Sequence, residues 1–418
     1  MLDIKFIREN TDLIIKNCED RRTKVDIHGL LKLDDQRKTH QQLLDSKRSE
    51  LKSSSKSKPT PEKIAELKQL SQSIKELEEE ERQILEKFHE ELSKVPNLTH
   101  KDSPIGEEAD FNVLHKNMEP KNFDFAPKDH LELFENKGLV DFERGSKVAG
   151  HKTYFSKNQL VHLNNALIQY GISILEKNGI TDIFETPDFA YKSMLQNAGF
   201  NPRGDSDEIY NIQGEELSLI ATSEITMLGY YSNEVVDLSK GPKIFAAISK
   251  CFRKEAGSYG RTSKGLYRVH QFSKLEIFAI CKPQDSEKIH EQIKNIELEI
   301  VDGLEIPYQL IDIASADLGG PAYRKYDIES YMVMKGDEQK QGDYGEITST
   351  SNCLDYQARR ANIKYVDENG KKQFAHTLNG TAIVTSRLPI ALAENHQDKD
   401  GNIHIPKALQ SFLNFTQI

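Results

Sequence analysis

Residues 241–281 read GPKIFAAISKCFRKEAGSYGRTSKGLYRVHQFSKLEIFAIC, and this stretch decides the fold. Two runs in which apolar and polar residues alternate flank a basic loop punctuated by glycines, a pattern that predicts a long β-hairpin. Since successive side chains of a strand point to opposite faces, Arg253 and Glu255 should share one face. On the return strand the same alternation groups five side chains: Arg268, His270, Phe272, Lys274 and Glu276.

The other face of the return strand should turn toward a core, and it carries Val269, Leu275, Ile277 and Ala279. The polar face then offers cations, two carboxylates and an aromatic ring, which suits a nucleotide with a cationic co-substrate. The connecting loop at residues 254–266 is longer than a hairpin needs, and long ordered loops tend to be functional. A solvated charged face would give the same spacing, so the pattern alone leaves both interpretations open.

The segment FRKEAGSYGRTSKGLYRVHQFSKLE, residues 252–276, resembles the second signature motif of class II aminoacyl-tRNA synthetases, in the form found in seryl-tRNA synthetases. GEITSTSNCLDYQARR at residues 345–360 continues the resemblance, and HTLNGTAIVTSRLPIALAENHQ at residues 376–397 resembles the third motif. Pro187, which ends a predicted strand at residues 180–189, stands where the class carries its first motif, at the dimer interface. The resemblance implies an α+β fold with an antiparallel-sheet catalytic domain, and a homodimer.

The composition is that of an acidic protein, with 418 residues, a formal net charge of -10 and 29% charged residues. Any polyanion must therefore be met by local basic patches. The four cysteines lie far apart without a CxxC pair, which argues against a disulfide framework and a zinc ribbon. Neither a membrane-spanning apolar run nor a signal peptide is evident, so we expect a cytoplasmic protein.

Residues 30–92 are rich in Lys, Glu, Gln and Leu and are interrupted by KSSSKSKPTP, residues 52–61, which no helix tolerates throughout. Two helices around a tip follow, and each can bury its narrow apolar stripe only against the other. The first keeps Leu30, Leu44 and Leu51 in sevenfold register, with Arg37 between them. In the second, the apolar seam comprises Leu67, Leu70, Ile74, Leu77, Ile84 and Phe88.

The predicted tip of this antiparallel coiled-coil arm is basic, and its cations are Lys47, Arg48, Lys52, Lys56 and Lys58. Such a cluster suits RNA backbone phosphates, although a helical hairpin can also be an oligomerisation or spacer element. The resemblance implies that the arm grips the long variable arm of tRNA(Ser). The predicted division is a tRNA-binding domain at residues 1–100, a linker at 101–127 and a catalytic domain at 128–418.

Several shorter segments have a second, purely structural interpretation. Thr222, Ser223 and Glu224 read as a helix N-cap with an acidic first turn, and the family places a Thr-x-Glu here against the ammonium group of the amino acid. Arg359 and Arg360 fit either the family's spacing or a structural ion-pair cluster. We expect helices at residues 160–175 and 287–301, and one that begins near Arg387.

The implied reaction converts ATP and L-serine to seryl-adenylate and pyrophosphate, and then transfers serine to the 3′ end of tRNA(Ser), with tRNA(Sec) as a second acceptor left open. The catalytic residues that the resemblance implies are Arg253, Glu346 and Arg387. The ATP-binding set is Arg253, Lys254, Glu255, Val269, Phe272, Glu346, Ile347, Thr348, Ser349 and Arg387. The serine-binding set is Thr222, Ser223, Glu224, Arg253, Glu276 and Thr381. Glu346 and Ser349 would hold Mg²⁺, whose preferred ligands are hard oxygens; no zinc is expected.

The chain departs from the family pattern at Tyr331, Val333 and Ser386, where the family usually has Trp, Pro, and Gly or Pro. Three other interpretations stay open: a class II ligase of another specificity, a related ligase that charges a carrier protein, and a non-catalytic paralogue that acts as a binding or scaffold protein. The helical arm disfavours the second of these. The signature arginines and glutamates disfavour the third.

Overall fold

The computed structural model describes residues 1–54, 60–200, 208–255 and 264–418. They form two compact units, residues 1–98 and 99–418. Two of the predicted tip cations, Lys56 and Lys58, lie outside the described residues, as does most of the basic hairpin loop. Within the described residues, no helix is both long and apolar enough to cross a membrane.

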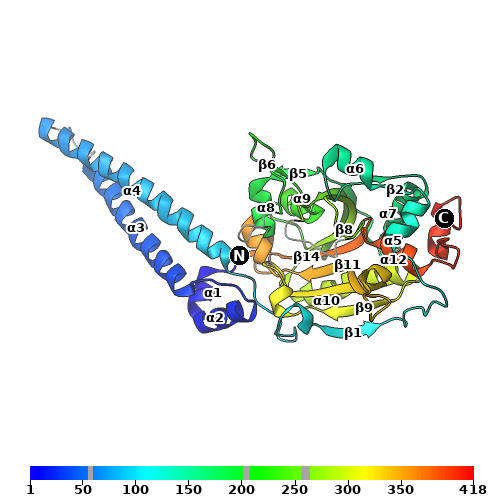
Figure 1. Ribbon diagram of the computed structural model, residues 1–418. Coiled ribbons are helices and arrows are strands. Elements are labelled where there is room, and N and C mark those ends of the chain that lie inside the picture. Colours follow the sequence, from blue (N-terminus) through cyan, green and yellow to red (C-terminus); the bar gives the residue numbers. More distant parts are fainter. Residues whose placement is uncertain (55–59, 201–207, 256–263) are drawn as a thin grey trace. The chain divides into compact units, whose positions relative to one another are not determined.

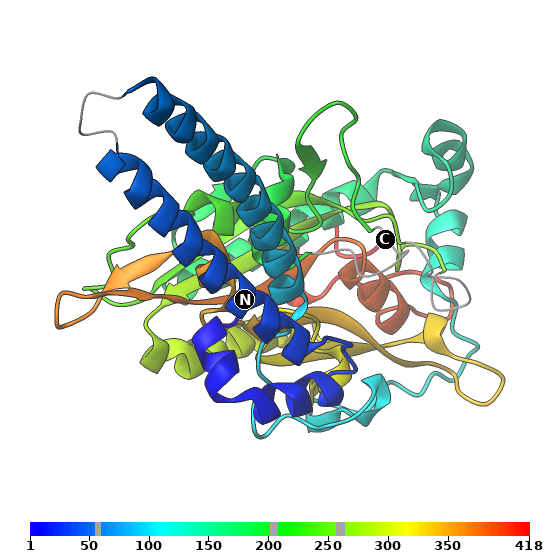
Figure 2. The same ribbon diagram turned by 90° about the vertical axis from the view of Figure 1, so that its left-hand side faces the viewer.

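The first unit is helical and contains the expected helical hairpin. It comprises α1 (Ile4–Glu9), α2 (Thr11–Asp20), α3 (Ile27–Ser54) and α4 (Pro61–Lys94), and the two long helices lie side by side (Figures 1 and 2). The side chain of Thr60 accepts a hydrogen bond from the backbone N of Lys63, so a Thr cap followed by proline begins α4. Cross-helix pairs fix the register, with His40 Nε2 3.3 Å from Glu80 and Arg48 Nη2 2.9 Å from Glu78.

The arginine in the seam of the first long helix has a local explanation. Leu30, Leu44, Ile74 and Phe88 are buried as the apolar pattern predicts. The guanidinium carbon of Arg37 lies 5.2 Å from the centroid of the Phe88 ring, and its Nη2 donates to Asp34 at 2.8 Å. The arginine stem thus covers apolar surface while its charge is paired.

The second unit is built on an eight-stranded sheet in the order β1-β9-β10-β11-β14-β8-β7-β4, antiparallel except for the β4–β7 pair (Figure 1). Its strands are β1 (Asn112–Lys116), β4 (Ile183–Glu185), β7 (Lys243–Phe252), β8 (Gln271–Cys281), β9 (Tyr308–Asp312), β10 (Arg324–Met332), β11 (Asp343–Asn352) and β14 (His376–Val384). Small two-stranded sheets are formed by β2 (Val140–Asp141) with β3 (Phe155–Ser156), β5 (Phe189–Tyr191) with β6 (Leu217–Leu219), and β12 (Lys364–Val366) with β13 (Lys372–Phe374). The α+β fold class is confirmed.

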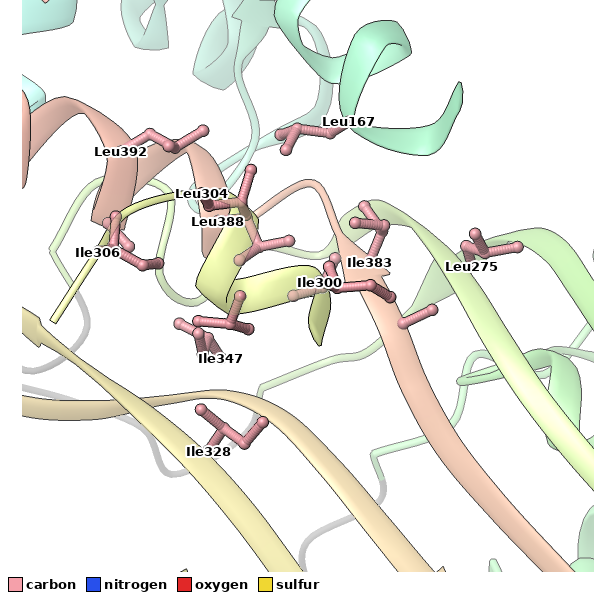
Figure 3. Close-up of a cluster of buried hydrophobic side chains, with 14 of the residues drawn as sticks. Leu167, Leu275, Ile300, Leu304, Ile306, Ile328, Ile347, Ile383, Leu388 and Leu392 are labelled. Atoms are coloured by element: carbon pink, nitrogen blue, oxygen red, sulfur yellow. The ribbon is translucent and has the colours of Figure 1, made fainter. Parts of the chain in front are cut away.

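The helices of this unit are α5 (His130–Asn136), α6 (Phe142–Ala149), α7 (Gln159–Lys177), α8 (Lys192–Ala198), α9 (Ser223–Tyr230), α10 (Ser286–Gly303), α11 (Tyr356–Ala361) and α12 (Leu388–Asn395). Figure 3 shows the core between them and the sheet, where Ile300 of α10 and Leu388 of α12 lie near Ile383 of β14 and Ile347 of β11. This apolar layer fixes α10 and α12 against the strands that carry the site. The predicted helices at 160–175 and 287–301 are confirmed.

The central hairpin is confirmed, and β7 pairs with β8 from Lys243↔Ile280 to Phe252↔Gln271. Two details differ from simple alternation. Strand β7 ends at Phe252, and Glu255 has a φ of 50°, a left-handed conformation, so its side chain is aimed by a turn and not by a strand. Beyond Glu276, both faces of β8 are buried, because Phe278 and Ile280 pack into a second apolar cluster.

The segment predicted as a linker needs a correction. Residues 112–116 form the edge strand β1, which pairs antiparallel with β9 and so belongs to the sheet of the second unit. All five of its side chains are exposed, so the sequence carries no alternating apolar signal there.

Candidate active site

A cavity of about 190 Å³ lies in the second unit against β8, β11 and β14. Most of the predicted site residues line it, from segments far apart in the sequence. They are Thr222, Glu224, Arg253, Glu255, Val269, Phe272, Glu276, Glu346, Ile347, Ser349, Thr381 and Arg387.

Three predicted residues do not line this cavity. Ser223 is buried and its Oγ donates to Glu276 at 3.2 Å, so it supports a lining residue. The hydroxyl of Thr348 donates to Glu297 of α10 at 3.1 Å, away from the cavity. Lys254 Nζ lies 5.8 Å from the Tyr210 ring centroid. Binding of ATP by Lys254 and Thr348 and of serine by Ser223 stays a prediction, and their side chains do not line this cavity.

At one end of the cavity Glu276 is the centre of a buried polar cluster. Its Oε2 lies 2.7 Å from Lys274 Nζ and also accepts from the hydroxyl of Thr222 and from the backbone N of Glu224, the latter at 3.3 Å. Burial acts to raise the pKa of Glu276, but the charge and hydrogen bond of Lys274 outweigh it and hold that pKa below its usual value. Glu276 is therefore an ionised acceptor inside the protein.

The predicted N-cap role of Thr222 is confirmed, and its side chain also lines the cavity. It is the N-cap of α9, and its hydroxyl accepts from the backbone N of Glu224 at 3.3 Å and from Lys274 Nζ at 2.6 Å. The sequence placed Lys274 on the correct face but assigned it no role. The cap and the site are thus the same local structure.

Glu224 is the second buried carboxylate of this end. Gln357 Nε2 donates to its Oε1 at 2.5 Å, and Gln357 is itself held by the hydroxyl of Thr377 at 2.7 Å. Burial, and then the negative charge of Glu276, raise the pKa of Glu224 to about 7. A cation that enters between the two carboxylates would relieve this repulsion.

This arrangement predicts a pH dependence of amine binding. Below about pH 7 Glu224 is protonated and attracts an ammonium group weakly, so the KM for an amino-acid substrate should rise by up to about tenfold per pH unit as the pH falls. We expect the KM to level off above pH 7, when both carboxylates are ionised. Steady-state kinetics across the neutral range will measure this, and Glu224→Gln should remove the dependence. A flat wild-type profile would contradict the role of Glu224.

The middle of the cavity carries the first signature arginine. The guanidinium carbon of Arg253 lies 5.4 Å from the Phe272 ring centroid, and its backbone N donates to His270 at 3.0 Å, which extends the hairpin ladder past β7. Glu255 accepts from Arg268 Nη1 at 2.9 Å. A ring and a guanidinium thus stand side by side, next to a paired carboxylate.

At the other end Arg387 and Glu346 form an ion pair, with Nη1 and Oε1 2.7 Å apart. Arg387 is the N-cap of α12, as the sequence predicted. Although burial opposes the shift, the charges of Arg387 and Lys325 lower the pKa of Glu346. Burial raises the pKa of neighbouring Asp327 to about 7, while Ser349 hydrogen-bonds to it and acts in the opposite direction. Tyr267, which the sequence did not single out, lies under Arg387, with 4.9 Å from guanidinium carbon to ring centroid.

The arginine pair at the end of the 345–360 segment makes local contacts. Arg359 Nε donates to Asp355 at 2.7 Å, and Arg360 donates to the Gln196 carbonyl at 2.7 Å and to the Tyr356 hydroxyl at 2.8 Å. Neither lines the cavity, so the ion-pair interpretation is favoured.

Comparisons with known proteins identify the family of the chain. Residues 208–396 match the family described as tRNA synthetase class II core domain (G, H, P, S and T), and residues 1–99 match the seryl-tRNA synthetase N-terminal domain. The chain is 45% identical to the serine–tRNA ligase of Treponema denticola over 427 residues, all of both chains. It is 44% identical to that of Rubrobacter xylanophilus over 421 residues, 99% of this chain and 98% of the relative.

Solved structures are similar as well. A seryl-tRNA synthetase from Pyrococcus horikoshii complexed with ATP superposes with a TM-score of 0.88 at 34% identity, covering 100% of this chain and 99% of that one. A prolyl-tRNA synthetase from Giardia lamblia, 16% identical, covers 66% of this chain and 53% of that one with a TM-score of 0.56, and shares the fold alone. The chain is a class II aminoacyl-tRNA synthetase by its fold and by its matching core domain. Within that class, the chain belongs to the seryl-tRNA synthetase family.

Proposed function

We propose that the cavity activates L-serine with ATP and that the first unit binds the tRNA that accepts the serine. The chain is then an ATP-dependent serine–tRNA ligase, working in the cytoplasm. The observation that carries the proposal is one continuous cavity with two buried carboxylates at one end and an Arg387–Glu346 pair at the other. The carboxylate end suits an ammonium and a hydroxyl, and the arginines suit phosphates.

At the carboxylate end of the cavity, three polar side chains would contact serine. Glu224, with its pKa near neutrality, accepts from the ammonium group, and ionised Glu276 and Thr381 meet the hydroxyl. Asn379 also lines this end, and its buried Oδ1 has no hydrogen-bond partner among the described residues. The hydroxyl of serine would satisfy it.

The nucleotide end leaves little covalent chemistry to the protein. The serine carboxylate attacks the α-phosphorus in line, pyrophosphate leaves, and the enzyme positions the reactants and neutralises charge. Arg253 would bridge the α-phosphate and the attacking carboxylate, since its planar fork suits two oxyanions. Phe272 would stack on adenine, Glu255 would accept from the adenine amino group, and Arg387 would meet the γ-phosphate.

Class II synthetases generally use Mg²⁺, and the donor set here fits it. Glu346 offers a carboxylate and Ser349 a hydroxyl, both hard oxygens on β11 that line the cavity. Mg²⁺ is usually held by one or two carboxylates together with substrate phosphates, so these two ligands suffice. When bound, the ion would neutralise phosphate charge.

We also propose a homodimer. The first-motif proline, Pro187, follows β4 at the edge of the eight-stranded sheet, and apolar side chains are exposed nearby on β5: Phe189 and Tyr191. Exposed apolar surface beside a sheet edge suits a second copy of the chain. Light scattering will give the mass in solution, and a monomer at micromolar concentration would contradict this.

Arg253→Ala tests the assignment of the nucleotide end. Removing a preorganised charge donor typically costs about 10²-fold to 10³-fold, and we expect that loss in kcat of serine-dependent ATP–pyrophosphate exchange. Circular dichroism should show an unchanged fold. Arg360→Ala is the matched control, because Arg360 lies outside the cavity, and it should keep near-normal exchange if it folds. Near-normal exchange by a folded Arg253→Ala would overturn the assignment, and no exchange by the wild type would favour the non-catalytic paralogue.

A further inference from the structure

Lys335 is a cation beside the cavity that the roles assigned above do not use. It ends η5 (Val333–Lys335), the short 3₁₀ turn after β10. Its Nζ lies 4.3 Å from the centroid of the Tyr267 ring, the same ring that Arg387 contacts at 4.9 Å. Tyr267 lines the cavity, so two cations meet one ring at the end where phosphates are expected.

Two neighbours hold Lys335 there. A Cβ at Gly345 would lie 2.8 Å from Cε of Lys335 and 3.1 Å from the Tyr267 hydroxyl, so the lysine stem lies against β11 at the residue before Glu346. The backbone N of Met334 donates to buried Glu394 at 3.1 Å. Because Glu394 is on α12, this bond ties the turn to the helix that Arg387 begins.

The charge of Lys335 is not neutralised locally. Within the described ranges, no hydrogen bond or ion pair joins its Nζ to another residue, whereas Arg387 is paired with Glu346. Burial, and then the positive charge of Arg387, lower the pKa of the Lys335 ammonium, and Glu329 and Glu346 oppose this without cancelling it. Neighbouring cations repel each other, so a bound polyanion would stabilise this corner.

We propose that Lys335 binds the terminal phosphates of ATP and the departing pyrophosphate, next to Arg387. The inference rests on the proposed function, since it takes the cavity as the nucleotide site. As the serine oxygen–phosphorus bond forms, the bond from the α-phosphorus to the bridging oxygen breaks, and negative charge grows on pyrophosphate. A lysine ammonium, a compact point charge, stabilises that charge.

Lys335→Met removes the charge and keeps an unbranched stem against Gly345 and Tyr267. The variant loses the charge-assisted hydrogen bond from Lys335 to the phosphates. The Kd of ATP and the inhibition constant of pyrophosphate should therefore each rise by about tenfold, the Kd being measured by calorimetry. The Kd of AMP, which lacks the terminal phosphates, and the KM for serine should not change. Lys335→Arg should restore most of the ATP affinity.

Lys340→Met is the matched control, because Lys340 is an exposed lysine of the same segment that pairs with Asp343 at 3.2 Å. It should bind ATP like the wild type. ATP affinity of Lys335→Met within twofold of the wild type would overturn the inference, and so would an equal loss of AMP affinity, which would mean that Lys335 only supports the cavity. If the wild type lacked serine-dependent exchange, the proposed function would fail, while the ATP and AMP comparison would still decide the role of Lys335.

Discussion

Alanine and glycine should be activated about 10⁴-fold to 10⁵-fold less efficiently than serine, in kcat/KM for ATP–pyrophosphate exchange. A site built to hydrogen-bond a hydroxyl leaves its own buried groups unpaired when the substrate lacks that hydroxyl. Here that group is the buried Oδ1 of Asn379, which has no partner among the described residues and lies beside the ionised Glu276. The hydroxyl of serine would pair with this oxygen, and alanine would leave it unpaired.

The exchange assay should be run with each amino acid after removal of trace serine, since contamination would mimic weak activation. Thr381→Val provides a matched control, because it removes one hydroxyl from the cavity wall and keeps its volume. It should lower kcat/KM for serine and leave kcat/KM for alanine unchanged, so the ratio of the two values becomes smaller. Alanine activation comparable to serine in the wild type would mean that the serine end is misplaced.

Threonine poses a different problem, because it offers the same hydroxyl with one more methyl group. A methyl group in a pocket is worth only about 1 to 3 kcal/mol, so steric exclusion is a weaker filter than an unsatisfied hydrogen bond. Threonine should therefore be the best non-cognate substrate.

The sequence predicted the parts of the site that are local. A cap signal placed Thr222 at the start of α9, period-two alternation built the β7–β8 hairpin, and a small-residue strand before a helix placed Arg387 at the start of α12. Each depends only on neighbours within one or two turns or strands. The resemblance then supplied the roles.

Groups that reach the site across strands were missed. Asn379 lies on β14 beside β8, and its pairing with Phe278 follows from sheet register, which a bulge between Thr381 and Ile383 shifts. Gln357 reaches Glu224 from α11, 133 residues away. Such contacts depend on topology, and no spacing within a single chain segment encodes them.

Deleting the outer part of the arm should abolish tRNA charging and leave serine-dependent exchange close to the wild-type rate. The structure indicates where to cut. The base of the arm is tied down by Arg8 and Arg37 at Asp34, both at 2.8 Å, and by Arg21 at the Asn97 carbonyl at 2.6 Å, so these pairs should be kept. His40 and Glu80 face each other across the two helices, so a short Gly/Ser loop can join them in place of residues 41–79. Duplex RNA is gripped by shape and backbone, which suits a long helical pair, and the catalytic motifs all lie outside the deleted segment.

The tip lysines give the matching point test. The test replaces three of the predicted tip cations, Lys52, Lys56 and Lys58, with alanine. Each lysine that no longer neutralises a phosphate lowers the slope of log K against log salt by about 0.7 to 0.9, so tRNA binding should weaken and its salt dependence should flatten. Replacing exposed Lys371, Lys372 and Lys399 of the second unit changes the net charge equally and should change neither the tRNA affinity nor its salt dependence.

The deletion has two outcomes that would contradict these predictions. Normal charging of tRNA(Ser) by the deletion variant would mean that the arm is a spacer or dimer element. Loss of exchange in a folded deletion variant would mean that the two units do not work separately.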